Sequence, residues 1–168
     1  MLTPILLRWS MRLFAFAFIA PGLVLAHDYK LGTLRMDHPY ALLKTEPTTR
    51  LEVYFRAFKN DGSQPDRLLA MRTPLAGQAI IRTETHSIDH EITWVPVQSL
   101  EIPAKGQVAM RHDTPDGYQL LLTEIRRPLK VGDRFPLILN FEKSGEKEVM
   151  VWIQTPRNTS ATHKHSFK

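Results

Sequence analysis

The side chains of this sequence that could do chemistry are its histidines and methionines, because imidazole nitrogens and thioether sulfurs bind metal ions. The chain holds seven His and six Met among 168 residues. Those whose spacing or position suggests a ligand are His27, His86, His90, Met110, His112, His163 and His165. Common enzyme motifs are absent, since the sequence has no cysteine nucleophile, no G-x-S-x-G, no H-E-x-x-H and no phosphate-binding loop. We therefore do not expect an enzyme.

The first group of candidate ligands is His86 and His90, which lie four residues apart in a polar segment. Asp89 and Glu91 lie beside them. Two imidazoles and a carboxylate can hold Cu(II) or Zn(II). The alternative is an ordinary solvated loop, where polar and charged residues usually lie.

The second group is Met110 and His112, two residues apart in a segment that the sequence predicts to be a strand. Residues at this spacing share one face of a strand. One thioether and one imidazole together suit copper. The alternative is a methionine that packs into the core beside a histidine at the strand edge.

The remaining candidates lie at the two ends of the mature chain. Cleavage after Ala26 would leave His27 at the N-terminus, where its amine and its imidazole can chelate Cu(II). His163 and His165 flank one lysine near the C-terminus and could capture Cu(II) there.

The first 26 residues have the composition of a signal peptide. They contain no acidic residue, two arginines (Arg8 and Arg12), an apolar run over 13–19 and the small residue Ala26 at the end. This run is shorter than the about 20 apolar residues that span a bilayer, although an uncleaved N-terminal anchor is the alternative. We expect a periplasmic protein with no stable membrane span after cleavage. The expected division is a leader over 1–26, a domain over 27–156 and a flexible polar tail over 157–168.

The composition is that of one globular domain, with 43% apolar and 23% charged residues. The net charge of +5 falls to +3 without the leader, whose two arginines are its only charges. Lys and Arg are scattered among Asp and Glu along the rest of the chain, so nucleic acid is not an expected partner. The absence of cysteine excludes a disulfide or a lipid-modified cysteine within the sequence.

The order of apolar and turn residues predicts an all-β fold. Short runs of β-branched and aromatic residues, separated by turn signals such as Asn60-Asp61-Gly62, indicate strands. These runs cover 29–36, 51–58, 78–84, 92–97, 107–112, 118–124, 135–142 and 147–154. Seven to eight short strands of this kind are typical of a β-sandwich or barrel.

Several segments of the chain, taken in order, also resemble a known family. They are 27–32 (HDYKLG), 38–41 (HPYA), 65–69 (PDRLL), 73–77 (TPLAG), 99–106 (SLEIPAKG), 127–137 (RPLKVGDRFPL) and 140–145 (NFEKSG). Together they resemble the PCuAC-type periplasmic copper chaperones over residues 27–154. The resemblance implies a cupredoxin-like Greek-key β-sandwich, expected to be a monomer, that binds Cu(I) outside the cytoplasm. It also implies a copper-accepting partner, such as an assembly factor or subunit of cytochrome oxidase.

The family holds Cu(I) with two histidines and two methionines, and the resemblance places these ligands at four positions of this chain. The residues found there are Arg82, Trp94, Gln119 and Leu121. None of these residue types is a useful copper ligand. The leading hypothesis is therefore a periplasmic copper-binding protein with an altered or relocated site.

Two other functions stay open. One is a metal-free interaction module that contacts its partner through Arg82 and Trp94, since arginine and tryptophan are enriched in interface hot spots. The other is a Cu(II) scavenger that works only through its two ends.

Overall fold

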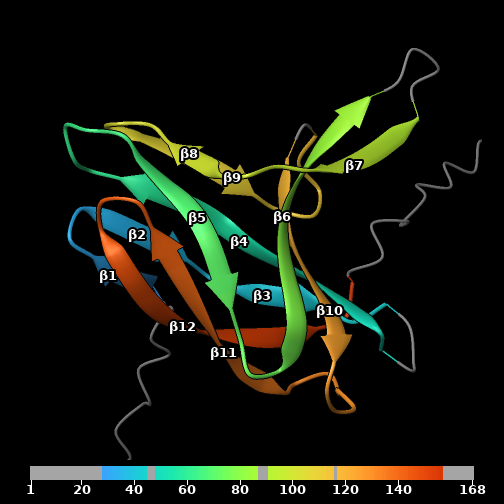
Figure 1. Cartoon of the computed structure of the whole chain (residues 1–168). Coiled ribbons are helices and arrows are strands. Elements are labelled where there is room, and N and C mark those ends of the chain that lie inside the picture. Colours follow the sequence, from blue (N-terminus) through green and yellow to red (C-terminus); the bar gives the residue numbers. More distant parts are fainter. Residues whose placement is uncertain (1–27, 45–47, 87–90, 116, 157–168) are drawn as a thin grey trace, which may run out of the picture.

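The computed structural model describes residues 28–44, 48–86, 91–115 and 117–156 (Figure 1). The expected leader and tail lie outside this part of the chain. Every regular element of the described residues is a β-strand, which confirms the all-β prediction. No helix in these residues is long and apolar enough to cross a membrane.

The described residues form twelve strands, more than the seven to eight that the sequence predicted. Their bounds are β1 Asp28–Leu31, β2 Leu34–Asp37, β3 Tyr40–Leu42, β4 Arg50–Asn60, β5 Asp66–Arg72, β6 Ala76–His86, β7 Ile92–Pro96, β8 Leu100–Ile102, β9 Gly106–Met110, β10 Tyr118–Ile125, β11 Arg134–Phe141 and β12 Gly145–Gln154. Three strands were missed (β3, β5 and β8), and two of these have only three residues. The single strand predicted over 29–36 is a hairpin, because Gly32 has a φ of +57° and turns the chain between β1 and β2.

One curved sheet organises the fold, in the order β7-β6-β10-β4-β3-β12-β11-β5-β8. Neighbours in this sheet are antiparallel except β3 and β12, which are parallel. The long strand β4 also belongs to a second group, because its last residues pair with β2 and β9 while its first residues pair with β3 and β10. Figure 1 shows the hairpin of β6 and β7 projecting at the upper right, at the end of this sheet.

The inward side chains of the curved sheet make one hydrophobic core. Every described strand except β1 and β7 contributes a buried residue to it. In β12, Val149, Val151 and Ile153 are buried, while Met150 and Trp152 on the other face are 38% and 39% exposed. This alternation is typical of a strand with one face on a core.

A second, smaller apolar cluster lies on the outer face of the sheet. It consists of Tyr40 and Leu42 of β3 and Tyr54 of β4. Ala41 and Val53, their neighbours in sequence, point the other way into the main core. Gln119 of β10 hydrogen-bonds to this outer cluster and to Arg82 of β6, and these residues form the candidate site.

Candidate functional site

A row of side chains crosses the outer face of the sheet from β6 to β11. Its members are opposite one another in the strand register or joined by a side-chain hydrogen bond: Arg82, Gln119, Tyr54, Tyr40, Trp152 and Arg134. We call this set the cross-sheet row. The rings of Tyr40 and Tyr54 are stacked, with centroids 5.6 Å apart. The guanidinium of Arg134 lies 5.3 Å from the ring centroid of Trp152.

At the β6 end of the cross-sheet row, Arg82 lies between two neighbouring strands. Its Nη2 donates a hydrogen bond to Oε1 of Gln119 on β10. Its guanidinium carbon lies 5.6 Å from the ring centroid of Trp94 on β7. Leu121 is two residues after Gln119, on the same face of β10, and is 7% exposed. The structure thus brings together Arg82, Trp94 and Gln119, three of the four positions at which the family resemblance places copper ligands.

A chain of hydrogen bonds continues from Gln119 across the sheet. The side chain of Gln119 is buried, and its Nε2 donates to the hydroxyl of Tyr54. That hydroxyl donates to Oε2 of Glu52 at 3.0 Å, and the same carboxylate pairs with Nζ of Lys44 at 2.5 Å. Arg82, Gln119, Tyr54 and Glu52 therefore form one connected polar network beside the outer apolar cluster.

Burial and neighbouring charges determine which protonation state each residue of this network has. Burial raises the pKa of Tyr54 strongly, and the negative charge of Glu52 adds to the rise, so the phenol stays neutral at physiological pH. Burial lowers the pKa of Arg82, while the charge of Glu52 opposes this. An arginine titrates so far above neutrality that it stays a cation here. Its Nε is buried without a hydrogen-bond partner.

The residues at this place do not fit Cu(I). A guanidinium offers five N–H donors and no lone pair, and an indole N–H is also only a donor. A soft Cu(I) ion prefers thiolate, thioether or imidazole ligands. A cation held at hydrogen-bond distance from Gln119 also repels a second cation at the same place. We therefore assign no copper-binding role to Arg82, Trp94 or Gln119.

The candidate ligands at the β6–β7 hairpin are only partly described. His86 is the last residue of β6, and its Nε2 lies 3.2 Å from Oε1 of Glu84. His90 belongs to residues 87–90, which lie outside the described part of the chain. His27, His163 and His165 also lie outside it, so their roles as ligands stay predictions.

Met110 and His112 do not share a strand face. Strand β9 ends at Met110, whose side chain is fully buried opposite Phe55. His112 follows the strand and is exposed, and its Nδ1 lies 3.0 Å from the hydroxyl of Tyr40. The prediction of a strand over 107–112 was wrong in its last two residues, because the chain turns at 111–114. The buried methionine corresponds to the core alternative.

A second histidine, His38, lies near His112. His38 and His112 both line a cleft of about 350 Å³ around Tyr40. His38 has a φ of +48°, unusual for a residue other than glycine, and its Nε2 lies 3.5 Å from Nε2 of Gln154. Within the described residues no three His, Cys, Asp or Glu side chains are close enough to hold a metal ion. No sequence signal reveals this cleft, because it depends on how β3, β12 and the segment after β9 meet.

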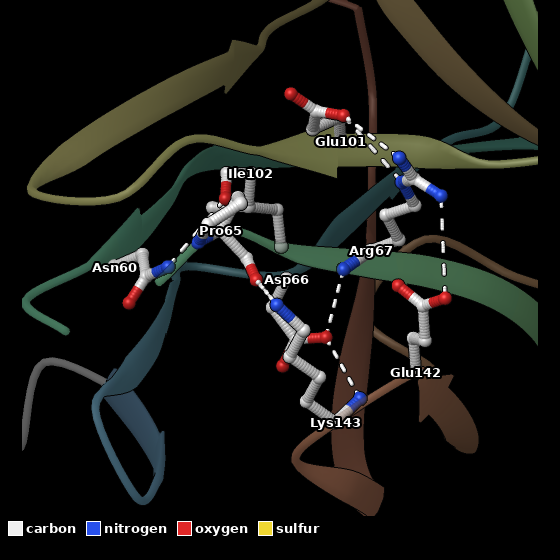
Figure 2. Close-up of polar contacts among 8 residues, drawn as sticks. All are labelled: Asn60, Pro65, Asp66, Arg67, Glu101, Ile102, Glu142 and Lys143. Carbon is white, nitrogen blue, oxygen red and sulfur yellow. Dashed lines mark hydrogen bonds and ion pairs between the residues drawn. The ribbon is translucent and has the colours of Figure 1, made fainter. Parts of the chain in front are cut away.

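A separate set of polar contacts, shown in Figure 2, lies at the β5–β8 end of the sheet and ties neighbouring strands and turns together. Asp66, at the start of β5, is 4% exposed, and its carboxylate lies inside this junction. It accepts hydrogen bonds from the backbone N of Arg67 (2.8 Å), Lys143 (3.0 Å) and Ser144 (3.1 Å), and from Oγ of Ser144 (2.6 Å). These bonds tie the start of β5 to the turn between β11 and β12.

Other contacts in Figure 2 extend this junction. Arg67 pairs with Glu101 of β8 at 3.4 Å and with Glu142 at 4.0 Å. Nδ2 of Asn60, at the end of β4, donates to the carbonyl of Ile102 at 3.5 Å. Because each donor or acceptor is matched within the protein, we interpret this junction as structural rather than as a binding site.

Comparisons with known proteins give one family and one fold. A family model described as putative LpqE-like lipoproteins matches residues 34–153. Among solved structures, the apo PCuAC domain from PmoF1 is 26% identical, with a TM-score of 0.63, and the alignment covers 77% of this chain and 100% of that one. The copper-bound PCuAC domain from PmoF2 is 24% identical, with the same TM-score, and the alignment covers 77% of this chain and 99% of that one.

A third solved structure is the Cu(I) form of DR1885 from Deinococcus radiodurans. It is 24% identical, with a TM-score of 0.55, over 77% of this chain and 82% of that one. No curated protein is significantly similar. The structural matches confirm the expected PCuAC-like β fold.

Proposed function

Because this chain belongs to the LpqE-like family and has the β fold of PCuAC domains, we propose that it is an extracytoplasmic binding module in which an arginine stands where related domains hold copper. In this proposal the domain keeps the fold of a copper chaperone but acts by contacting a partner protein. The observation that carries it is the contact of Arg82 with Gln119 and Trp94.

The physical argument is one of charge and ligand chemistry. The guanidinium supplies the positive charge that Cu(I) would bring, and its hydrogen bond to Gln119 continues to Tyr54 and Glu52. Copper could enter only if Arg82 moved away, which would leave Oε1 of the buried Gln119 without its donor. Losing a partner for a buried polar group costs about 1–3 kcal/mol.

The β6–β7 hairpin is the face that supports a role in protein contact. Ile92 of β7 is 61% exposed, and Trp94 lies two residues further along the same strand. Strand β7 is the last strand of the sheet, so one side of its backbone is open to pairing. Tryptophan and arginine are the residue types that most often dominate binding energy at interfaces.

A Cu(I) titration against a chromophoric chelator tests the proposal. The wild-type protein should not compete for one equivalent of Cu(I). A variant that carries the family's ligand types at the four positions should compete with the chelator for Cu(I). Its substitutions are Arg82→His, Trp94→Met, Gln119→His and Leu121→Met. Tight one-to-one binding by the wild type that survives replacement of every candidate His and Met ligand named in the sequence analysis would overturn the proposal, because only the Arg82 site would then remain for copper.

The contact surface can be tested in cells with a photocrosslinking amino acid at position 92. The proposal expects one discrete crosslinked product that disappears when Trp94→Ala is added. The same crosslinker at Glu148, an exposed residue of β12, is the matched control. Equal products from both positions would contradict a specific face on the hairpin.

The second candidate function is the handling of copper as cargo, for delivery toward cytochrome oxidase assembly. The observation that favours it is the pair of Glu84 and His86 at the exposed end of β6. An imidazole beside a carboxylate suits Cu(II) better than Cu(I). His90 in the same hairpin, and His27, His163 and His165 at the ends, would complete such a site. A Cu(II) titration in which His86→Ala lowers the affinity and His112→Ala does not would favour this function.

The family description as putative lipoproteins indicates a location outside the cytoplasm. We place the protein in the periplasm, with residues 1–26 acting as the leader. Mass spectrometry of the protein from a periplasmic extract should find His27 as the first residue. Recovery of the uncleaved chain in the membrane fraction would contradict this placement.

A further inference from the structure

The loop between β10 and β11, residues 126–133, gathers positive charge at one end of the molecule. Arg126, Arg127 and Lys130 belong to the loop, and Arg134 follows it at the start of β11. All four residues are exposed. Asp133 is the one carboxylate of the described residues that pairs with this group, through Arg127 at 3.3 Å.

The shape of this loop is fixed by the protein itself. Leu129 is 3% exposed and belongs to the main core. The backbone N of Lys130 donates to Oδ2 of Asp133 at 3.1 Å, and the backbone N of Gly132 donates to the carbonyl of Ile153 at 2.9 Å. Because the loop is anchored at these points, its outward side chains need little further ordering to meet a partner.

Hollows with apolar walls lie on both sides of Arg126 and Arg127. One, of about 650 Å³, is also lined by Ile125, Pro128 and Leu129. The other, of about 330 Å³, is lined by Pro74, Leu75, Phe135 and Pro136 together with Arg134. At the tip of the loop Val131 is 52% exposed, between Lys130 and Gly132. The arginine and lysine side chains of the loop therefore lie beside apolar surface. This arrangement suits a ligand with an anionic head and an apolar part.

The loop lies at the far end of β6 from the β6–β7 hairpin. The backbone N of Arg126 donates to the carbonyl of Leu75 at 2.9 Å, just before β6 begins, and β6 then runs eleven residues to His86. In Figure 1 the loop is the orange segment below the tip of β10, whereas the hairpin projects at the top. A surface bound at the loop would leave the hairpin free.

We propose that this loop binds the surface of an anionic phospholipid bilayer, with Arg126, Lys130 and Arg134 at the headgroup phosphates and Val131 inserted between headgroups. An acidic protein is the other occupant that the charge would suit. The bilayer is favoured because the exposed apolar side chain sits at the tip of the cationic loop, and because the hollows beside the cations are large enough for lipid groups. The proposal is independent of whether the domain binds copper.

Flotation of the purified protein with lipid vesicles tests this proposal. The probes are vesicles of phosphatidylcholine alone and vesicles with phosphatidylglycerol added, at low salt and at high salt. Each cation near an anionic surface adds a factor of about 5 to binding. The double variant Arg126→Gln/Lys130→Gln should therefore bind the anionic vesicles about 25-fold more weakly. Val131→Ser should also weaken binding.

The matched control is Arg35→Gln/Lys59→Gln, which removes the same charge from exposed positions on β2 and β4. The proposal expects this control to bind nearly as tightly as the wild type, and binding to fall at high salt. Equal losses in the two double variants would show that net charge alone is responsible and would overturn the proposal. Failure of the wild type to float with anionic vesicles would also overturn it and would leave an acidic protein as the partner.

Discussion

Replacing Asp66 with asparagine should destabilise the domain more than any other single carboxylate-to-amide change in the junction of Figure 2. The side chain of Asp66 is buried at the start of β5, and its two oxygens accept four hydrogen bonds, three of them from backbone N–H groups. An asparagine keeps the shape but replaces one oxygen with an NH₂ group. That NH₂ group would face either the pair of donors from Ser144 or those from Arg67 and Lys143.

The expected magnitude follows from those bonds. Hydrogen bonds to a charged group contribute about 1.5–3 kcal/mol each, and a buried donor left without an acceptor costs about 1–3 kcal/mol. The hydroxyl of Ser144 can rotate and accept from the new amide, which recovers part of the loss. We therefore expect Asp66→Asn to lower the free energy of unfolding by about 2–4 kcal/mol at pH 7.

The pH dependence of this loss has a definite sign. Burial raises the pKa of Asp66, but the hydrogen bonds from Ser144, Lys143 and Arg67 outweigh it and hold the pKa below its ordinary value of 3.8. A carboxylate whose pKa is lowered by folding stabilises the protein above its ordinary pKa, and this contribution disappears as the pH falls through the lowered value. The gap between wild type and Asp66→Asn should therefore narrow below pH 4.

Urea unfolding followed by tryptophan fluorescence at several pH values measures both effects. Glu101→Gln is the matched control, because Glu101 is an exposed partner of Arg67 in the same junction. An exposed ion pair of this kind contributes at most about 1 kcal/mol. A loss below about 1 kcal/mol for Asp66→Asn, or a gap that stays constant as the pH falls, would refute the reasoning.

Two further changes test the packing around the candidate site. Tyr54→Phe should lower the free energy of unfolding by about 1–3 kcal/mol, because the buried amide of Gln119 and the carboxylate of Glu52 lose their common partner; an unchanged urea midpoint would contradict the network. Gly77→Ala should lower the melting temperature at a cost of about 1–3 kcal/mol, because a Cβ there would lie 2.9 Å from Cβ of Glu124; a wild-type melting curve would show that β6 and β10 have room to move apart.

Much of the fold could be predicted because the strands that matter most carry a strong pattern. In β12 the aliphatic residues alternate with polar or exposed ones, and the structure buries that face. β3 and β8 have only three residues each, too few for an alternation to be visible. The sequence of β5, DRLLAMR, carries no β-branched residue, so propensity did not indicate a strand there. Sheet pairing rather than local preference makes these three segments extended.

The candidate site was predictable in part. The family resemblance gave Arg82, Trp94 and Gln119 as equivalent positions, and the structure brings them into contact. The continuation to Tyr54 could not be predicted, because it depends on the register between β10 and β4. The cleft around Tyr40 was missed for the same reason, since its walls come from segments far apart in the sequence.

In the proposed function, the guanidinium of Arg82 occupies the position that copper would take in a related domain. The most direct measurement is an NMR titration of the wild-type protein with Cu(I), followed through the Nε–H of Arg82, the side-chain amide of Gln119 and the indole N–H of Trp94. These three signals should stay unchanged at one equivalent of Cu(I), whether or not ligands elsewhere respond. A shift or loss of all three signals at one equivalent would show that copper displaces the arginine, and would contradict the proposed function.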